Sequence, residues 1–130
     1  MFRSEFCSYM RSKQVEIRKW LINQIGQPEQ VESIETRSQR FLEESIELVQ
    51  ATGLSEAQCH DLVKYVFNRP IGQVPQEIGG TIVCLAVLAE RLDYNVGVCL
   101  EMEIDRIHRP EMIDKVRAAI ERKRNDGVGI

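Results

Sequence analysis

Eight consecutive apolar residues run from Ile82 to Ala89 within a segment that reads as one helix. On a helical wheel their side chains surround the axis completely, so no side of this helix is polar. A chain of 130 residues has the size of one domain, and a domain this small seldom encloses a whole helix by itself. We therefore expect a homo-oligomer in which a second subunit covers this helix.

The remainder of the chain also reads as helices separated by helix-breaking residues. Aromatic residues are scarce, and the composition is typical of a helical protein. Gly26 and Pro28 end the first pattern, Gly53 stops the second, and Ser55 is a plausible N-cap for the third. The fold class is therefore predicted to be all-α, a bundle of five to six helices without strands. The expected helices span residues 4–25, 31–52, 55–68, 75–92, 96–107 and 110–123.

Residues 1–130 are expected to form a single domain with three parts. These are an N-terminal helix and linker at 1–30, a core at 31–95 and C-terminal helices at 96–124. The net charge of −3 gives no general attraction for nucleic acid, and the apolar run is too short to span a membrane. The four cysteines form no CxxC pair, and no secretory segment is recognised, so we expect free thiols and a cytoplasmic protein.

Two carboxylates, Glu44 and Glu47, lie three residues apart in the predicted helix 31–52, and Glu77 follows near the start of helix 75–92. Residues at this spacing have Cβ atoms about 5–6 Å apart, so both can reach one small hard cation. Glu43 adds a third acid, and Arg40 is the nearest basic residue. The pattern indicates a divalent-metal site acting on a phosphate ester. The plainer explanations are a solvated helix face for the pair and a complement to the helix dipole for Glu77.

Residues 37–95 resemble the MazG-type all-α nucleoside triphosphate pyrophosphohydrolases. The resemblance depends on Glu44-Ser45-Ile46-Glu47 and on Glu77, which leads into an apolar helix. The family has an Asp where this chain has Gly80. Short phage-type relatives resemble this chain in the Glu-x-Gly-Gly variant and in a later stretch matched by Glu101, Glu103, Arg106 and Ile107.

The resemblance implies hydrolysis of (d)NTPs to (d)NMP and pyrophosphate, with guanine nucleotides as the first choice. It also implies Mg²⁺ or Mn²⁺ as cofactor, a homotetramer in preference to a dimer, and the cytoplasm of a bacterial or phage-infected cell. Glu44, Glu47 and Glu77 would be both catalytic residues and metal ligands, and Glu103 is the best candidate to replace the acid missing at Gly80. Substrate phosphates would be held by basic residues, for which the candidates are Arg40, Arg69, Lys115 and Arg117.

A second hypothesis is a catalytically silent helical protein that forms oligomers and kept the fold after losing the Asp. A di-iron carboxylate bundle would require Glu-x-x-His pairs. The sequence contains none, so we do not favour that class.

Overall fold

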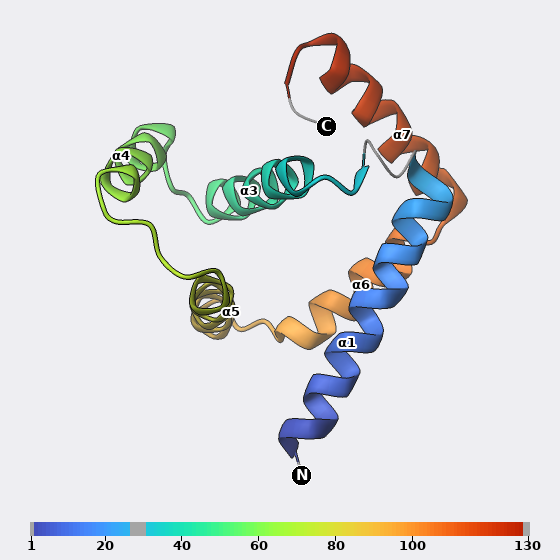
Figure 1. The fold of residues 1–130 in the computed structure, drawn as a ribbon, viewed down its shortest axis with the longest axis horizontal. Coiled ribbons are helices and arrows are strands. Elements are labelled where there is room, and N and C mark those ends of the chain that lie inside the picture. Colours follow the sequence, from blue (N-terminus) through green and yellow to red (C-terminus); the bar gives the residue numbers. More distant parts are fainter. Residues whose placement is uncertain (1, 27–30, 129–130) are drawn as a thin grey trace. The chain divides into compact units, whose positions relative to one another are not determined.

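The computed structural model describes residues 2–26 and 31–128, except for the side chains of Phe2 and Arg3 (Figure 1). Within these residues all regular structure is helical, which confirms the predicted all-α class. The predicted linker at 27–30 lies outside the described residues. None of the described helices is both long and apolar enough to cross a bilayer. The elements in chain order are α1 (Phe2–Trp20), the π-helix η1 (Leu21–Ile25), α3 (Ile34–Ala51), α4 (Glu56–Phe67), α5 (Val74–Arg91), α6 (Val96–Ile107) and α7 (Pro110–Asn125).

Local hydrogen bonds explain where several helices begin. At the start of α4, the Ser55 hydroxyl accepts from the Gln58 amide at 3.2 Å, and the Gln58 side chain accepts from the Ser55 amide at 2.9 Å. This reciprocal arrangement is a capping box, and it confirms Ser55 as the N-cap. Just before α3 the Ser33 hydroxyl accepts from the Thr36 amide at 3.0 Å, and the helix begins at Ile34 rather than at residue 31.

The first helix differs from the prediction of one regular helix over 4–25. The α-helix ends at Trp20, and a π-helical turn continues from Leu21 to Ile25. A π-helix hydrogen-bonds to i+5, which widens the helix locally. An imperfect apolar rhythm in the sequence does not separate such a turn from an ordinary α-helix, and for this reason the prediction was wrong here.

The chain divides into two units, which we call the terminal unit (Met1–Glu43 with Ile104–Ile130) and the central unit (Glu44–Glu103). The described core of the terminal unit consists of Ile25, Val31 and Ile104, with 8%, 3% and 4% of their surface exposed. Here η1, which continues directly from α1, packs against α7. The Arg117 Nε group on α7 donates a hydrogen bond to the Gln24 carbonyl in η1 at 2.8 Å, which fastens α7 to this turn.

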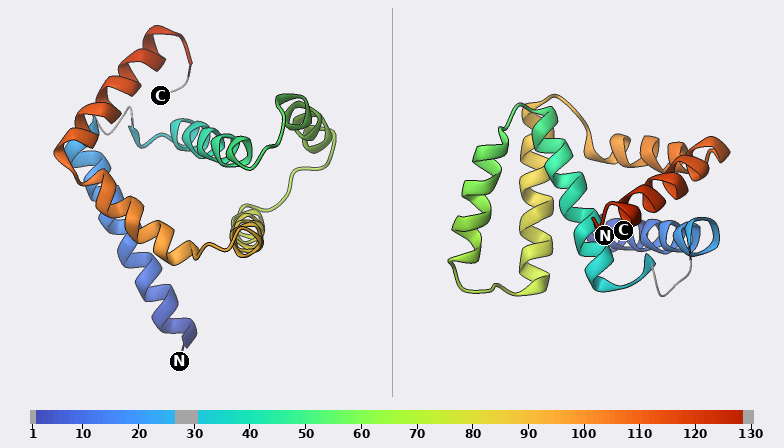
Figure 2. Two further views of the ribbon diagram at one scale, coloured as in Figure 1. Left: turned by 180° about the vertical axis from the view of Figure 1, so that it is seen from behind. Right: turned by 90° about the horizontal axis from the view of Figure 1, so that it is seen from above.

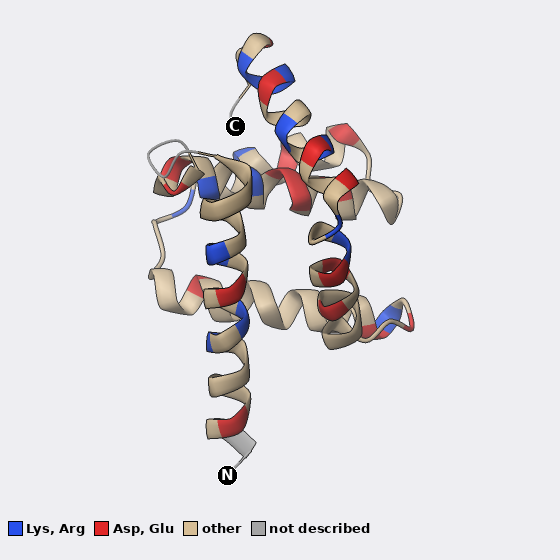
Figure 3. Ribbon diagram, turned by 90° about the vertical axis from the view of Figure 1, so that its right-hand side faces the viewer, with Lys and Arg blue, Asp and Glu red and all other residues tan. Residues whose placement is uncertain are grey.

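The central unit, whose residues are all described, contains no buried residue. Its helices α4 and α5 run antiparallel (Figure 2), but they do not pack along their lengths. Figure 3 shows that α5 carries charged residues only near its ends. Its apolar residues Ile82, Val83 and Val87 are 52%, 62% and 65% exposed. The helix predicted around residues 82–89 is therefore present, and its cover by a second subunit stays a prediction.

Candidate functional site

Glu44 and Glu47 lie on the uninterrupted helix α3, and both are exposed. Because the residues are three positions apart in a regular α-helix, their side chains emerge from neighbouring positions one turn apart. The Glu47 side chain makes no hydrogen bond or ion pair with the described residues, so its carboxylate is available to a ligand.

Glu77 lies in the first turn of α5, where its amide donates to the Gln73 carbonyl at 2.9 Å. Its exposed side chain folds back against the loop before the helix. A Cβ atom placed on Gly72 would lie only 2.0 Å from Oε1 of Glu77. Gly72 thus leaves the space in which the Glu77 carboxylate rests.

Gly80, which stands where the resembling family has an acid, lies in an open part of α5. A Cβ atom built there meets no other atom within 4 Å, and the same holds for Gly79. A β-carbon is therefore accommodated at position 80 without moving a neighbour.

All four predicted metal ligands belong to the central unit, with Glu103 exposed on α6. In residues 2–26 and 31–128 there is no group of three or more His, Cys, Asp or Glu side chains close enough to hold one metal ion. One chain therefore presents Glu44 and Glu47 as a pair on α3, while Glu77 and Glu103 stand on two other helices.

The predicted phosphate-binding residues are divided between the units. In the central unit the Arg69 guanidinium lies over the Tyr65 ring, with its central carbon 5.1 Å from the ring centroid. In the terminal unit Arg117 is held by η1, whereas Lys115 is exposed and makes no hydrogen bond or ion pair with the described residues. Arg40 is paired with Glu43.

Glu43 connects two cations of the terminal unit, because its Oε2 atom accepts hydrogen bonds from Arg40 and from Lys123 on α7. Burial alone raises the pKa of Glu43. The hydrogen bonds and positive charges of Lys123 and Arg40 outweigh burial and lower the pKa below its ordinary value of 4.5. Arg37, one turn before Arg40, has its pKa lowered by burial and then by the charge of Arg40.

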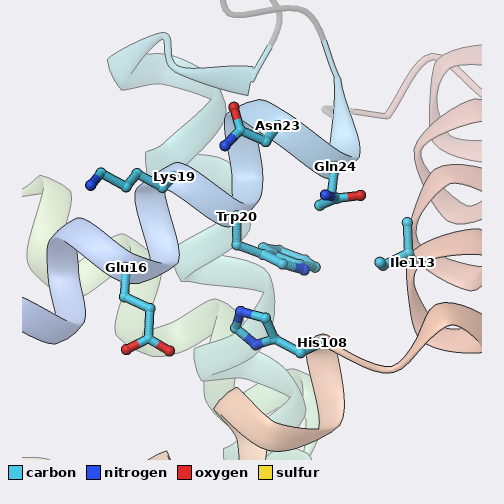
Figure 4. A pocket seen from close by; sticks show the side chains of 7 residues that line it. All are labelled: Glu16, Lys19, Trp20, Asn23, Gln24, His108 and Ile113. Atoms are coloured by element: carbon cyan, nitrogen blue, oxygen red, sulfur yellow. The ribbon is translucent and has the colours of Figure 1, made fainter.

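A pocket of about 320 Å³ in the terminal unit has none of the predicted site residues in its lining (Figure 4). The Trp20 and His108 rings lie beside each other in its lining, with centroids 6.2 Å apart and planes inclined at 49°. The Trp20 Nε1 atom is itself shielded from solvent and has no acceptor among the described residues. No sequence pattern indicates that these two rings meet, because Trp20 and His108 are far apart along the chain. The lining residues are Glu16, Lys19, Trp20, Asn23, Gln24, His108 and Ile113.

Comparison of the chain with models of protein families, with curated proteins and with solved structures finds no match. The functional assignment therefore depends on the residues and their arrangement.

Proposed function

We propose that this protein is a Mg²⁺-dependent nucleoside triphosphate pyrophosphohydrolase that acts as a homo-oligomer. The observation that carries this proposal is the exposed Glu44 and Glu47 pair on uninterrupted α3, together with the exposed Glu77 in the first turn of α5. The products would be a (d)NMP and pyrophosphate.

The carboxylate pair fits the coordination habits of the proposed metal. Mg²⁺ keeps several water ligands and is usually bound through one or two carboxylates together with substrate phosphates. Two side chains one turn apart on α3 are sufficient for such a site. When bound, the ion would neutralise phosphate charge and favour ionisation of a water ligand. Additional ligation by Glu77 or Glu103 requires α5 or α6 to lie closer to α3 than in a single chain.

Association of identical chains would supply the packing that the central unit lacks. A helix of 12 residues, the length of α4, is marginal in water on its own, and most of the stability of helices in proteins comes from packing of an apolar face. Burying one exposed valine side chain contributes about 1.5–3 kcal/mol. Val83 and Val87 are two of the residues on α5 with this potential. A second copy of the chain is the natural partner for this apolar surface, because its own helices are equally apolar and exposed. We propose a tetramer in preference to a dimer.

Basic residues would hold the phosphates of the substrate. Lys115 is the least constrained candidate, since no described residue engages its ammonium group. Arg40 and Arg69 have partners that a polyphosphate must compete with, namely Glu43 and the Tyr65 ring. Arg117 is tied to the Gln24 carbonyl through Nε, which leaves the two terminal nitrogens of its guanidinium for other contacts.

The test is to incubate the protein with Mg²⁺ and each nucleoside triphosphate, beginning with GTP and dGTP, and to separate the products. Formation of the nucleoside monophosphate with an equal amount of pyrophosphate is expected. Release of orthophosphate without pyrophosphate would contradict the proposal. Sedimentation of the same sample measures the oligomeric state, where a monomer at micromolar concentration would contradict the proposed assembly.

The second candidate is a catalytically silent oligomeric protein, which is favoured by the absence of an acidic side chain at Gly80. It predicts the same assembly without hydrolysis. Thermal unfolding separates the two, because a ligand that binds only the folded state raises its stability with concentration. No shift with Mg²⁺ and nucleotide together, in a protein that forms the oligomer, would favour this candidate.

A further inference from the structure

The pocket of about 320 Å³ in the terminal unit has no role in the proposed function. Its lining comes from α1 and η1 on one side and from His108 and Ile113 on the other (Figure 4). Small-molecule sites in proteins have volumes of about 300–1,000 Å³ and combine apolar or aromatic walls with a few polar groups. This pocket is at the lower end of that range, so its ligand would be small.

The walls of the pocket favour a flat, uncharged molecule. The Trp20 indole is half-buried at the end of α1, and such a ring stacks on other planar rings. The lining contains one acidic residue, Glu16, and one basic residue, Lys19, so it is matched to neither an anion nor a cation. Glu16 is also paired with Lys13 at 3.4 Å.

The His108 ring presents a hydrogen-bond acceptor with no partner. Its Nδ1 atom lies 2.7 Å from the Ile104 carbonyl oxygen, and because a carbonyl only accepts, Nδ1 carries the hydrogen. In the neutral imidazole Nε2 is then an acceptor. No described residue donates to Nε2, so an N–H group of a ligand can do so.

The Trp20 ring adds a donor with no partner. Its Nε1–H group is shielded from solvent and has no acceptor among the described residues. Leaving a shielded donor unpaired is costly, and an acceptor atom of a ligand beside the indole would remove that cost. The centroids of the Trp20 and His108 rings are 6.2 Å apart, so one donor and one acceptor lie on neighbouring rings.

The backbone next to Trp20 is unusual in the same place. The π-helix η1 follows Trp20 directly and supplies Asn23 and Gln24 to the lining. Helices of this type are rare and frequently occur at functional sites. The hydrogen bond from Arg117 to the Gln24 carbonyl at 2.8 Å holds the turn from outside the lining.

We propose that this pocket binds an uncharged planar nitrogen heterocycle of the size of a nucleobase, which stacks on Trp20 and donates an N–H group to Nε2 of His108. Nucleobases carry both N–H donors and acceptor atoms on their edges, which matches the two unpaired groups. The inference goes beyond the proposed function, because all predicted metal ligands belong to the central unit. Binding in the terminal unit requires neither metal nor hydrolysis.

Fluorescence titration of the full chain with adenine in metal-free buffer tests the site. Trp20 is the single tryptophan of the chain, so its emission reports on this pocket alone. Saturable quenching is expected, whereas free N-acetyltryptophanamide shows only collisional quenching without saturation. Parallel titrations with adenosine and AMP separate the two sources of the heterocycle. If both bind as well as adenine, the ligand is a nucleoside or nucleotide, and if adenine alone binds, it is a free base.

Variants of His108 test the acceptor. In His108→Asn the amide can still donate to the Ile104 carbonyl, but no atom takes the place of Nε2. Adenine should bind this variant about fivefold more weakly, which is the usual effect of one lost hydrogen bond. His108→Gln, whose longer side chain brings an acceptor near the position of Nε2, should lose less. The matched control is His60→Asn, at an exposed position on α4, which should bind adenine like wild type.

Absence of saturable quenching by adenine in wild type would overturn the inference, as would equal affinities of wild type and His108→Asn. Benzyl alcohol, a neutral ring without nitrogen, should bind much more weakly than adenine. Equal binding of the two would overturn the inference in favour of a site for an apolar aromatic side chain. Circular dichroism checks folding, and calorimetry of Trp20→Leu, expected to bind adenine about tenfold more weakly, replaces the His108 variants if they do not fold.

The outcome is separable from that of the proposed function. Adenine binding without hydrolysis of nucleoside triphosphates leaves this inference standing and removes the proposed function. Hydrolysis without adenine binding in metal-free buffer does the reverse.

Discussion

The ammonium group of Lys123 donates a hydrogen bond to Oε2 of Glu43, eighty positions earlier in the sequence. The contact joins α7 to α3 within the terminal unit, and Arg40 donates to the same oxygen atom. The Glu43 carboxylate therefore serves as a shared acceptor for two cations. Its ionisation state consequently influences how firmly these helices are held together.

The first prediction concerns acid stability. The pKa of Glu43 is lower in the folded protein than its ordinary value, so the stabilisation is fully present above about pH 4.5 and is lost as pH falls through the lower folded pKa. Glu43→Gln removes this dependence. Urea unfolding between pH 7 and pH 3 should show that wild type loses more stability on acidification than the variant. Parallel pH profiles would contradict the prediction.

The second prediction concerns the capping box of α4. Ser55→Ala removes the acceptor for the Gln58 amide, and loss of such a cap typically costs about 1 kcal/mol. Ser55→Gly should cost only a few tenths of a kcal/mol at the same position. Urea denaturation at one fixed protein concentration measures both. The idea fails if the two variants are equally stable.

The third prediction is that Gly80→Asp folds and gains affinity for Mg²⁺. The site is open around position 80, and Asp is a slightly better helix former than Gly. Without metal, repulsion from Glu77 one turn earlier costs about 0.2–0.5 kcal/mol and offsets that gain. Melting curves with and without Mg²⁺ should therefore show a larger metal-induced shift for Gly80→Asp than for Gly80→Ala. Equal shifts would show that position 80 does not face the metal.

The fourth prediction concerns the exposed pair on α3. Glu47→Gln keeps the shape of the side chain and removes its charge, so the rise in melting temperature produced by Mg²⁺ with a non-hydrolysable triphosphate should be reduced or lost. Hydrolysis should fall in parallel. Glu90→Gln is the matched control, because Glu90 is an exposed acid on α5 outside the proposed site. A loss of the same size in both variants would mean that only net charge matters.

Local rules were enough to predict most helix boundaries. Ser55 was identified as a cap from its residue type and position, and α6 has the bounds expected from the apolar pattern. Capping, glycine and proline act over a few residues, so their effect is present in the sequence itself. The spatial separation of the Glu44 and Glu47 side chains could be predicted for the same reason, because one uninterrupted helix determines it.

Contacts between segments that are far apart in the sequence could not be predicted from the sequence and are seen only in the folded chain. Nothing in the residues near Arg37 indicates that its Nε atom is shielded from solvent, because burial is produced by segments that meet only on folding. The pairing of Lys123 with Glu43 and the approach of His108 to Trp20 are of the same kind. Desolvation and charge pairing depend on distance in space, and the chain sets that distance only when its helices pack.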